Sequence, residues 1–199
     1  VMAYGYNPFI STWSPYHGAA YSVVEACSKV VACGADYSGM RFSYQEYFER
    51  MTSDAHSWGK PLSALLSALK MQVALGLPSI GGKDSMSGTF EHINVPPTLI
   101  AFGITTVDAS KVISPELKWE GNKVYLRRHT PLGNMMPDTE ALKANWNYSH
   151  SQIEDGNIVS AWSVGFGGVA EALAKMSFGN LFGVDVKVSE KDLFSYGYG

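Results

Sequence analysis

The sequence predicts a mixed α/β (α+β) fold, because apolar residues recur at helical spacing in three segments and β-branched stretches typical of strands stand between them. The composition agrees with a folded protein: 46% of the 199 residues are hydrophobic and 17% are charged, which excludes disorder, collagen and coiled coil. At about 150 residues per domain, this length allows one large domain or one and a fraction.

The first expected helix runs from about residue 19 to residue 32 and ends at Gly34, since glycine readily takes the left-handed conformation of a helix stop. Its apolar face consists of Val23, Cys27, Val30 and Val31. A second helix is expected to start near Pro61 and to end at Gly76 and Pro78. The residues at helical spacing in it are Leu62, Leu65, Leu66, Leu69 and Val73.

Between residues 81 and 88 a glycine-bounded polar segment follows a short apolar stretch and precedes a β-branched strand at 98–107. We therefore expect a loop between strands. Two glycines let the backbone approach a ligand, Lys83 supplies a point charge, Asp84 can hold a metal, and Ser85 can donate to phosphate oxygens. The segment is a phosphate-contacting loop or, alternatively, a polar turn.

The rest of the sequence predicts further helices and strands. It also predicts a domain boundary near residues 129–137, with one domain at 1–130 and the beginning of a second at 131–199. Strands are expected at 123–128, 158–163 and 184–188. A helix is expected at 138–155 with Leu142, Trp146 and Ile153 facing inward, and another after 165–168. The apolar stripe of this last helix consists of Val169, Ala172, Leu173 and Met176.

At the strand-to-helix junction, Gly165 and the free N–H groups beside it could receive an anion. Glu25 and Lys29 form an i,i+4 pair, which is either a further candidate site or a solvated ion pair.

The formal net charge of −3, without a block of lysine and arginine, argues against nucleic acid as a partner. No apolar stretch reaches the roughly 20 residues that cross a bilayer, so we expect no membrane segment. Cys27 and Cys33 lie too far apart on one helix for a disulfide, which indicates a reducing compartment, the cytoplasm. Because residue 1 is Val and the sequence stops as a strand pattern develops, we expect an internal piece of a longer protein.

Several motifs together resemble the second half of single-chain phosphoribosylformylglycinamidine synthase. These motifs are Gly82-Lys83-Asp84-Ser85-Met86-Ser87, Pro96-Pro97-Thr98-Leu99-Ile100-Ala101-Phe102-Gly103, Asp108 and Ser114-Pro115-Glu116-Leu117. The helix ending at Gly34 and the Gly167-to-Asn180 helix are similar to helices of that family. The resemblance implies an aminoimidazole ribonucleotide synthetase-like N-terminal domain followed by the start of the superfamily's C-terminal domain.

The resemblance also implies an activity. The family converts formylglycinamide ribonucleotide, ATP and glutamine to formylglycinamidine ribonucleotide, ADP, phosphate and glutamate in purine biosynthesis. The implied partners of this chain are the first half and the glutaminase domain of the same enzyme. Lys83, Asp84 and Ser85 would contact nucleotide or substrate phosphate near the interface between the halves, and the fragment alone would be inactive.

In this family the second half can hold an auxiliary ATP or ADP with Mg²⁺. Glu25 falls on the position of a magnesium-ligating glutamate, whereas Lys29 stands where the family has a ligating amide. Ser163 and Phe166 stand in place of acids. An ammonium has no lone pair for a metal, so the resemblance implies a weakened cluster in which Lys29 neutralises phosphate directly.

Two alternatives stay open. The chain could be another ATP-dependent member of the superfamily, such as selenophosphate synthetase or thiamine monophosphate kinase, although the aspartate-rich metal pattern of those enzymes is missing. It could also be an interaction module that pairs an apolar face with a partner domain and binds no small molecule.

Overall fold

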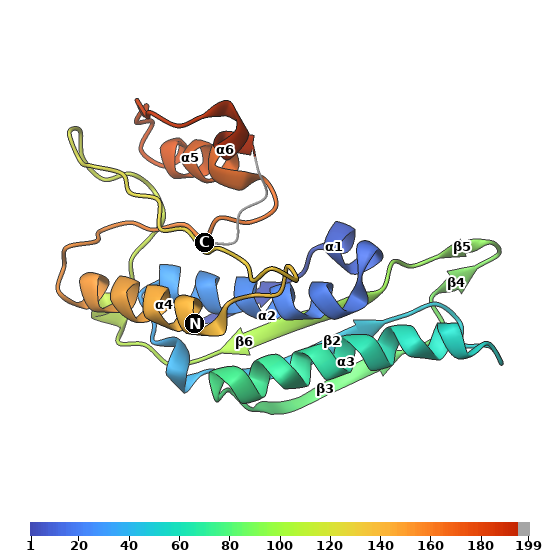
Figure 1. Cartoon of the computed structure of the whole chain (residues 1–199). Helices are drawn as coiled ribbons and strands as arrows, with labels where there is room; N and C mark the ends of the chain where they lie inside the picture. The colour runs from blue at the N-terminus through green and yellow to red at the C-terminus, as the bar shows by residue number, and fades with distance from the viewer. Residues whose placement is uncertain (195–199) are drawn as a thin grey trace.

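A four-stranded sheet forms the centre of the computed structural model, which describes residues 1–194 (Figure 1). Its strands are β1 (Met2–Gly5), β2 (Arg41–Tyr47), β3 (Ser79–Ser85) and β6 (Thr98–Ile104). They lie in the order β1-β6-β2-β3, and β6 is antiparallel to both of its neighbours whereas β3 is parallel to β2. A short hairpin of β4 (Thr89–Phe90) and β5 (Ile93–Asn94) projects beyond this sheet.

Helices cover one face of the sheet. The α-helices are α1 (Pro8–Trp13), α2 (Pro15–Ala32), α3 (Ala55–Leu75), α4 (Thr139–Glu154), α5 (Gly168–Phe178) and α6 (Glu190–Phe194), with 3-10 turns η1 (Tyr37–Gly39) and η2 (Ala109–Lys111). α2 packs against β1 and β6, and α3 packs beside α2 along the β2–β3 side (Figure 1). α5 and α6 pack together away from the sheet. The mixed α/β prediction is confirmed.

Helix α2 forms the centre of the core. Ser14 caps its first turn by accepting the His17 N–H, and Pro15 occupies the first position, where its missing N–H costs nothing. The helix ends after Ala32, and Gly34 has a φ of 99°, as predicted for the stop. The predicted apolar face is buried, so the helix is confirmed and begins four residues earlier than the apolar pattern indicated.

Helix α3 begins six residues before Pro61, so the predicted start is wrong. Asp54 caps the helix by accepting the His56 N–H, and this cap outweighs the proline as a start signal. The leucine stripe that predicted the helix faces outward. The residues buried on the opposite side are Ser57, Pro61, Ala64, Ser67, Ala68, Met71 and Leu75. Small side chains let α3 approach α2 closely, and for that reason the inner face is not the most apolar one.

Residues 81–85 are not a loop, which corrects the prediction for the glycine-bounded segment. They belong to β3, whose backbone pairs with β2 in parallel register, Lys83 beside Gln45 and Asp84 beside Glu46. This pairing satisfies backbone groups that a loop would leave to water. At Gly82 an added Cβ would lie 2.7 Å from the Tyr44 carbonyl oxygen, so the close pairing of β3 with β2 at this position requires glycine.

In the C-terminal part of the chain, from residue 123 on, the two predicted helices are confirmed and the three predicted strands are wrong. Asp138 caps α4 by accepting the Glu140 and Ala141 N–H groups, and Leu142, Trp146 and Ile153 are buried as predicted. The segments 123–128, 158–163 and 184–188 form no strand. A segment with β-branched or alternating apolar residues becomes a strand only where a neighbouring strand accepts and donates its backbone hydrogen bonds, and within residues 1–194 these segments have no such neighbour.

Helix α4 is joined to the core of the first part of the chain. Leu142 and Trp146 belong to the same buried cluster as the α2 valines. The Trp146 indole N–H donates to Ser28 Oγ at 3.0 Å, and its ring lies 5.0 Å from that of Tyr37. An element on the C-terminal side of the predicted boundary thus packs on α2.

Candidate functional site

Three of the predicted site residues meet where β1, α2 and the loop before α5 come together. Lys29 Nζ lies 2.7 Å from Glu25 Oε1 and donates to the Tyr4 carbonyl oxygen at 2.9 Å. The other Glu25 oxygen accepts the Tyr6 N–H at 3.0 Å. A Cβ added to Gly165 would lie 3.9 Å from Glu25 Oε1. We call this group the β1–α2 junction.

The junction follows from local sequence. Glu25 and Lys29 are four residues apart on α2, so their side chains lie on one face of the helix. Gly5 brings β1 against that face, because an added Cβ would lie 2.1 Å from the Ser22 carbonyl oxygen and 2.8 Å from Glu25 Cβ. A residue with a side chain cannot occupy this position without moving α2, so the glycine sets how closely the strand approaches the ion pair.

The N-terminus of α5 is already capped from within its own helix. The Gly167 N–H donates to Glu171 Oε2 at 2.9 Å, and the Gly168 N–H donates to the Gly165 carbonyl at 3.0 Å. The bond from Lys175 keeps the pKa of Glu171 below its ordinary value, with a smaller contribution from the Gly167 N–H. Any anion that approaches these amides therefore meets a resident carboxylate.

The junction does not fit a divalent cation. Hard cations bind clusters of carboxylates and carbonyls, whereas Glu25 is paired with an ammonium and the described residues contain no group of three His, Cys, Asp or Glu side chains able to hold a metal. Ser163 Oγ, at the position where the family resemblance implies an acid, is buried and finds no hydrogen-bond partner among residues 1–194. The ammonium of Lys29 fills the electrostatic role of a cation next to Glu25.

The motif residues Lys83, Asp84 and Ser85 lie elsewhere. They are on β3, at the opposite edge of the sheet from β1, about 14 Å away across three strand spacings. Lys83 Nζ donates to the Asp84 carbonyl, and Ser85 Oγ lies 3.3 Å from Ser87 Oγ. On this edge strand Lys83 and Asp84 are exposed and Ser85 is half-buried, so the structure does not bring the three residues together with Glu25 and Lys29.

Glu46 is a candidate that the sequence analysis missed. It is 4% exposed, its Oε1 has no hydrogen-bond partner among residues 1–194, and it pairs across the strands with Asp84. Burial, with a smaller contribution from the Asp84 charge, raises the pKa of Glu46 to about 7. The signal was present in β2, where Phe42, Tyr44 and Glu46 alternate with polar residues, because a carboxylate in the inward series marks a buried acid.

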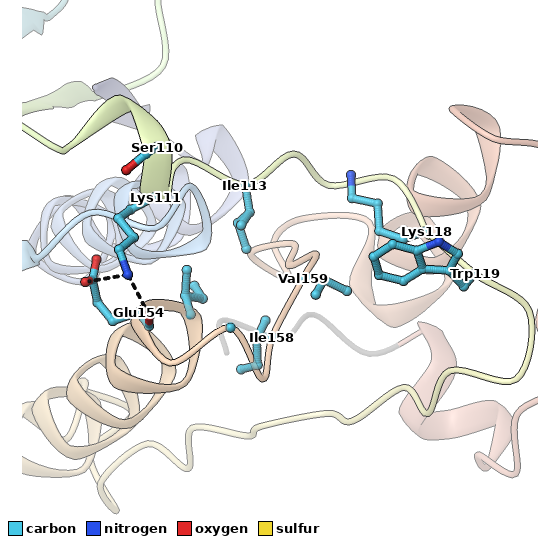
Figure 2. Close-up of a pocket in the computed structure, with 10 residues that line it drawn as sticks. Ser110, Lys111, Ile113, Lys118, Trp119, Glu154, Ile158 and Val159 are labelled. Atoms are coloured by element: carbon cyan, nitrogen blue, oxygen red, sulfur yellow. Dashed lines mark hydrogen bonds and ion pairs between the residues drawn. The ribbon is translucent and has the colours of Figure 1, made fainter.

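An open cavity of about 360 Å³ lies apart from all these residues, between the segment after β6 and the end of α4 (Figure 2). Both of its lysines are already bound to glutamates. Lys111 Nζ lies 3.4 Å from Glu154 Oε2 and donates to the Glu154 carbonyl, and Lys118 pairs with Glu116. The cavity thus offers an apolar floor with few free polar groups, and it matches none of the predicted site residues.

The two cysteines are free: Cys27 is buried and Cys33 is half-buried. Burial raises the pKa of both thiols, so neither resembles a reactive nucleophile. No helix within residues 1–194 is long and apolar enough to cross a membrane.

Comparison with known proteins gives consistent matches. The chain is 26% identical over 205 residues to phosphoribosylformylglycinamidine synthase subunit PurL of Picrophilus torridus, covering 94% of this chain and 27% of that protein. The PurL subunit of Pyrobaculum aerophilum is 23% identical over 197 residues, covering 92% of this chain and 28% of that protein. The chain therefore spans a little over a quarter of the length of these relatives. No protein-family model matches it.

Solved structures show the same fold. Thermotoga maritima PurL complexed with ATP superposes with a TM-score of 0.65 at 19% identity, over 88% of this chain and 28% of that one. The same protein complexed with formylglycinamide ribonucleotide (FGAR) gives a TM-score of 0.63 at 17% identity, over 88% of this chain and 32% of that one. Sequence similarity over nearly the whole chain and a shared fold fit the PurL and aminoimidazole ribonucleotide synthetase-like family.

Proposed function

We propose that this chain is part of a phosphoribosylformylglycinamidine synthase, the ATP- and glutamine-dependent ligase that converts formylglycinamide ribonucleotide to formylglycinamidine ribonucleotide in purine biosynthesis. The observation that carries the proposal is the match to PurL over 94% of this chain in sequence and 88% in structure. Structures of Thermotoga maritima PurL with ATP, ADP and FGAR support a role in binding nucleotide or substrate.

Within that enzyme, the chain serves as an accessory half and not as the complete catalyst. The reaction needs ammonia from glutamine, and neither Cys27 nor Cys33 fits a glutaminase nucleophile, because burial keeps both thiols protonated. Ammonia must then come from a glutaminase domain or subunit outside this sequence. We expect the 199-residue chain by itself to form no product.

Lys29 is the phosphate-binding residue in this proposal. An ammonium has three N–H donors, and two of them are directed to Glu25 and to the Tyr4 carbonyl. The side chain is 36% exposed, so the third donor can reach a phosphate oxygen. Glu25 and Tyr4 would hold the ammonium in place, which lowers the entropy lost on binding.

Magnesium supplies charge neutralisation at the transferred phosphoryl group in ligases of this chemistry. At the β1–α2 junction the donor set does not fit Mg²⁺, so Lys29 takes over the neutralisation there. Lys83, Asp84 and Ser85 are proposed as a second phosphate contact, at the sheet edge toward the other half of the enzyme. Because β3 is an exposed edge strand, these three residues are accessible to a ligand, and the partner half would complete the binding site.

The test is thermal unfolding of the purified chain with ATP or ADP, in Mg²⁺ and in EDTA. Ligand at tenfold excess over its Kd should raise the Tm by about 3–5 °C by mass action. Lys29→Met should abolish the shift, and the matched control Lys187→Ala, at an exposed lysine in the C-terminal coil, should keep it. A shift that needs Mg²⁺ and survives Lys29→Met would contradict the assignment of Lys29.

A second candidate is an interaction module without a small-molecule site. It is favoured by the exposed apolar side chains on α3 and by the position of Lys83, Asp84 and Ser85 on an exposed strand. No change in Tm with millimolar ATP, ADP or formylglycinamide ribonucleotide, together with normal folding, would support this alternative.

A further inference from the structure

Residues 129–138 connect the first part of the chain to α4, and we call this segment the connector. It is packed on the core. The Tyr21 hydroxyl of α2 donates to the Met135 carbonyl oxygen at 2.9 Å. Met136 is 5% exposed and belongs to the buried cluster around α2. The connector is therefore held in one conformation by contacts with α2, although it forms neither helix nor strand.

One imidazole joins the two ends of the connector. The Asp138 N–H donates to His129 Nε2 at 3.0 Å. Because a backbone amide can only donate, Nε2 must be the acceptor, and the proton of the neutral ring lies on Nδ1. Asp138 is also the cap of α4, where its carboxylate accepts the Glu140 and Ala141 N–H groups. We call the hydrogen bond between His129 and Asp138 the connector latch.

Protonation of the imidazole is incompatible with the connector latch. Both nitrogens of an imidazolium are donors, so a proton on Nε2 would face the Asp138 N–H and the bond would be lost. Burial lowers the pKa of His129 below its ordinary value, and the Asp138 carboxylate opposes this effect. The open connector then binds the proton better than the closed one. The closed form is favoured above about pH 6.5 and loses stability as the pH falls below that value.

The other charged groups beside the connector are engaged in contacts of their own. Residues 130–137 have no ionisable side chain. His17 of α2 lies with Nε2 3.0 Å from the Asn134 carbonyl oxygen, and it can donate to this oxygen in either charge state. The remaining contacts are Arg127 over the Tyr148 ring, Arg128 with Asp192 and Glu140 with Lys143. The charge that acts on His129 is thus the Asp138 carboxylate.

We propose that the connector latch is a pH-sensitive contact: neutral His129 holds the connector closed, and protonation of its Nε2 opens residues 129–138. Helix α4 stays on α2 in the open form, because the Trp146 indole still donates to Ser28 within the core. The change is confined to the connector and the first turn of α4. This inference goes beyond the proposed function and does not depend on nucleotide binding.

Nitrogen-15 NMR of the imidazole rings tests the connector latch in the unaltered chain. At pH 7.5 the His129 ring should be the Nδ1–H tautomer with an unprotonated Nε2, and the Asp138 amide resonance should titrate together with the ring. A His129 ring in the Nε2–H tautomer overturns the proposal, because that nitrogen could not accept the bond.

Amide hydrogen exchange measures the opening itself. The protection factor of the Asp138 amide, corrected for the intrinsic effect of pH, should fall between pH 7.5 and pH 4.5. The loss should be about tenfold for each unit by which the measured pKa of His129 lies below its ordinary value of about 6.5. Constant protection down to pH 4.5 in the parent chain overturns the proposal.

Two variants separate the connector latch from general acid effects. His129→Gln should keep its protection at low pH, because the amide oxygen of glutamine accepts the same N–H at every pH. The matched control is His92→Gln, at an exposed histidine in the turn between β4 and β5, and it should lose protection like the parent chain. Circular dichroism confirms that each variant is folded. An equal loss in His129→Gln and the parent chain would assign the opening to another group and overturn the proposal.

Discussion

Helices α2 and α3 pack against the same sheet, but the buried polar groups of the core are not equally satisfied throughout. Under α2 the buried polar groups are satisfied: Ser22 Oγ donates to the Gly18 and Leu99 carbonyls, and Ser28 Oγ accepts the Trp146 indole N–H. Elsewhere in the core, Ser67 of α3 and Tyr44 and Glu46 of β2 each have a buried polar atom without a hydrogen-bond partner in residues 1–194. Buried polar groups without partners are costly, so we expect these three side chains of β2 and α3 to lower the stability of the core, in contrast to Ser22 and Ser28 of α2.

The difference teaches that apolar content does not decide which helix face is buried. α2 buries the valines and the cysteine that its periodicity marks, whereas the buried side of α3 contains Ala64, Ser67 and Ala68 and its leucine stripe, Leu62, Leu65, Leu66 and Leu69, is exposed. The cause is the short distance between α2 and α3. α3 must lie close to α2 to close the core, and only small side chains fit between two helices in close contact.

The largest expected effect concerns the approach of α2 to β1. Gly5→Ala should lower the free energy of unfolding by about 3 kcal/mol, because the new Cβ would lie 2.1 Å from the Ser22 carbonyl oxygen and neither backbone can move freely. Urea denaturation followed by circular dichroism measures the change. The control is Gly81→Ala on β3, where a Cβ meets no atom within 4 Å, and an equal loss there would show that α2 is not the tighter half.

The second prediction concerns Glu46, the buried acid of β2. Because the pKa of folded Glu46 is raised to about 7, its favourable contribution is complete below the unfolded pKa of about 4.3 and is lost as the pH rises through 7. Glu46→Gln should leave stability near pH 4 almost unchanged and raise it by about 2 kcal/mol at pH 8. Urea midpoints at several pH values measure this, with Glu120→Gln as the exposed control. A parallel pH dependence in parent and variant would contradict it.

The third prediction compares the two faces of α3 directly. Ala64→Leu adds three carbons to a residue that is 1% exposed and should cost about 2 kcal/mol through overpacking against the core. Leu65→Ala removes three carbons from a residue that is 47% exposed and should change the stability of the monomer by less than about 0.5 kcal/mol. Both are measured by thermal unfolding at 1 µM. The reverse ranking would mean that α3 is rotated about its axis.

The smallest expected effect concerns the ion pair at the β1–α2 junction. Lys29→Met should cost about 1 kcal/mol, since Glu25, whose side chain is 13% exposed, loses its counter-ion but keeps the Tyr6 N–H. Glu25→Gln, Lys29→Met completes a double-mutant cycle whose coupling energy reports the pair itself. A coupling energy of zero would assign both side chains to the solvated surface.

The helices were predictable from sequence to different degrees. α2 and α4 were predictable because each has a buried apolar stripe at helical spacing, although the Ser14 cap makes α2 begin four residues before its stripe. The start of α3 was not, since the Asp54 cap competes with the signal of Pro61. Glu46 could have been identified from alternation in β2, but its pKa is raised by burial in the tertiary structure and, to a smaller extent, by Asp84, which lies 38 residues further along the chain on a paired strand.

The sequence by itself determined the mixed fold, the helix faces of α2 and α4 and the resemblance to PurL, because local periodicity, capping and motif order are properties of short segments. Only the tertiary structure decided that the lysine-aspartate-serine motif is an edge strand, that the segments 123–128, 158–163 and 184–188 are not strands, and that the leucine stripe of α3 points outward. These outcomes depend on which backbone lies alongside each segment, and a hydrogen bond or a close contact between distant segments has no signature in either segment alone.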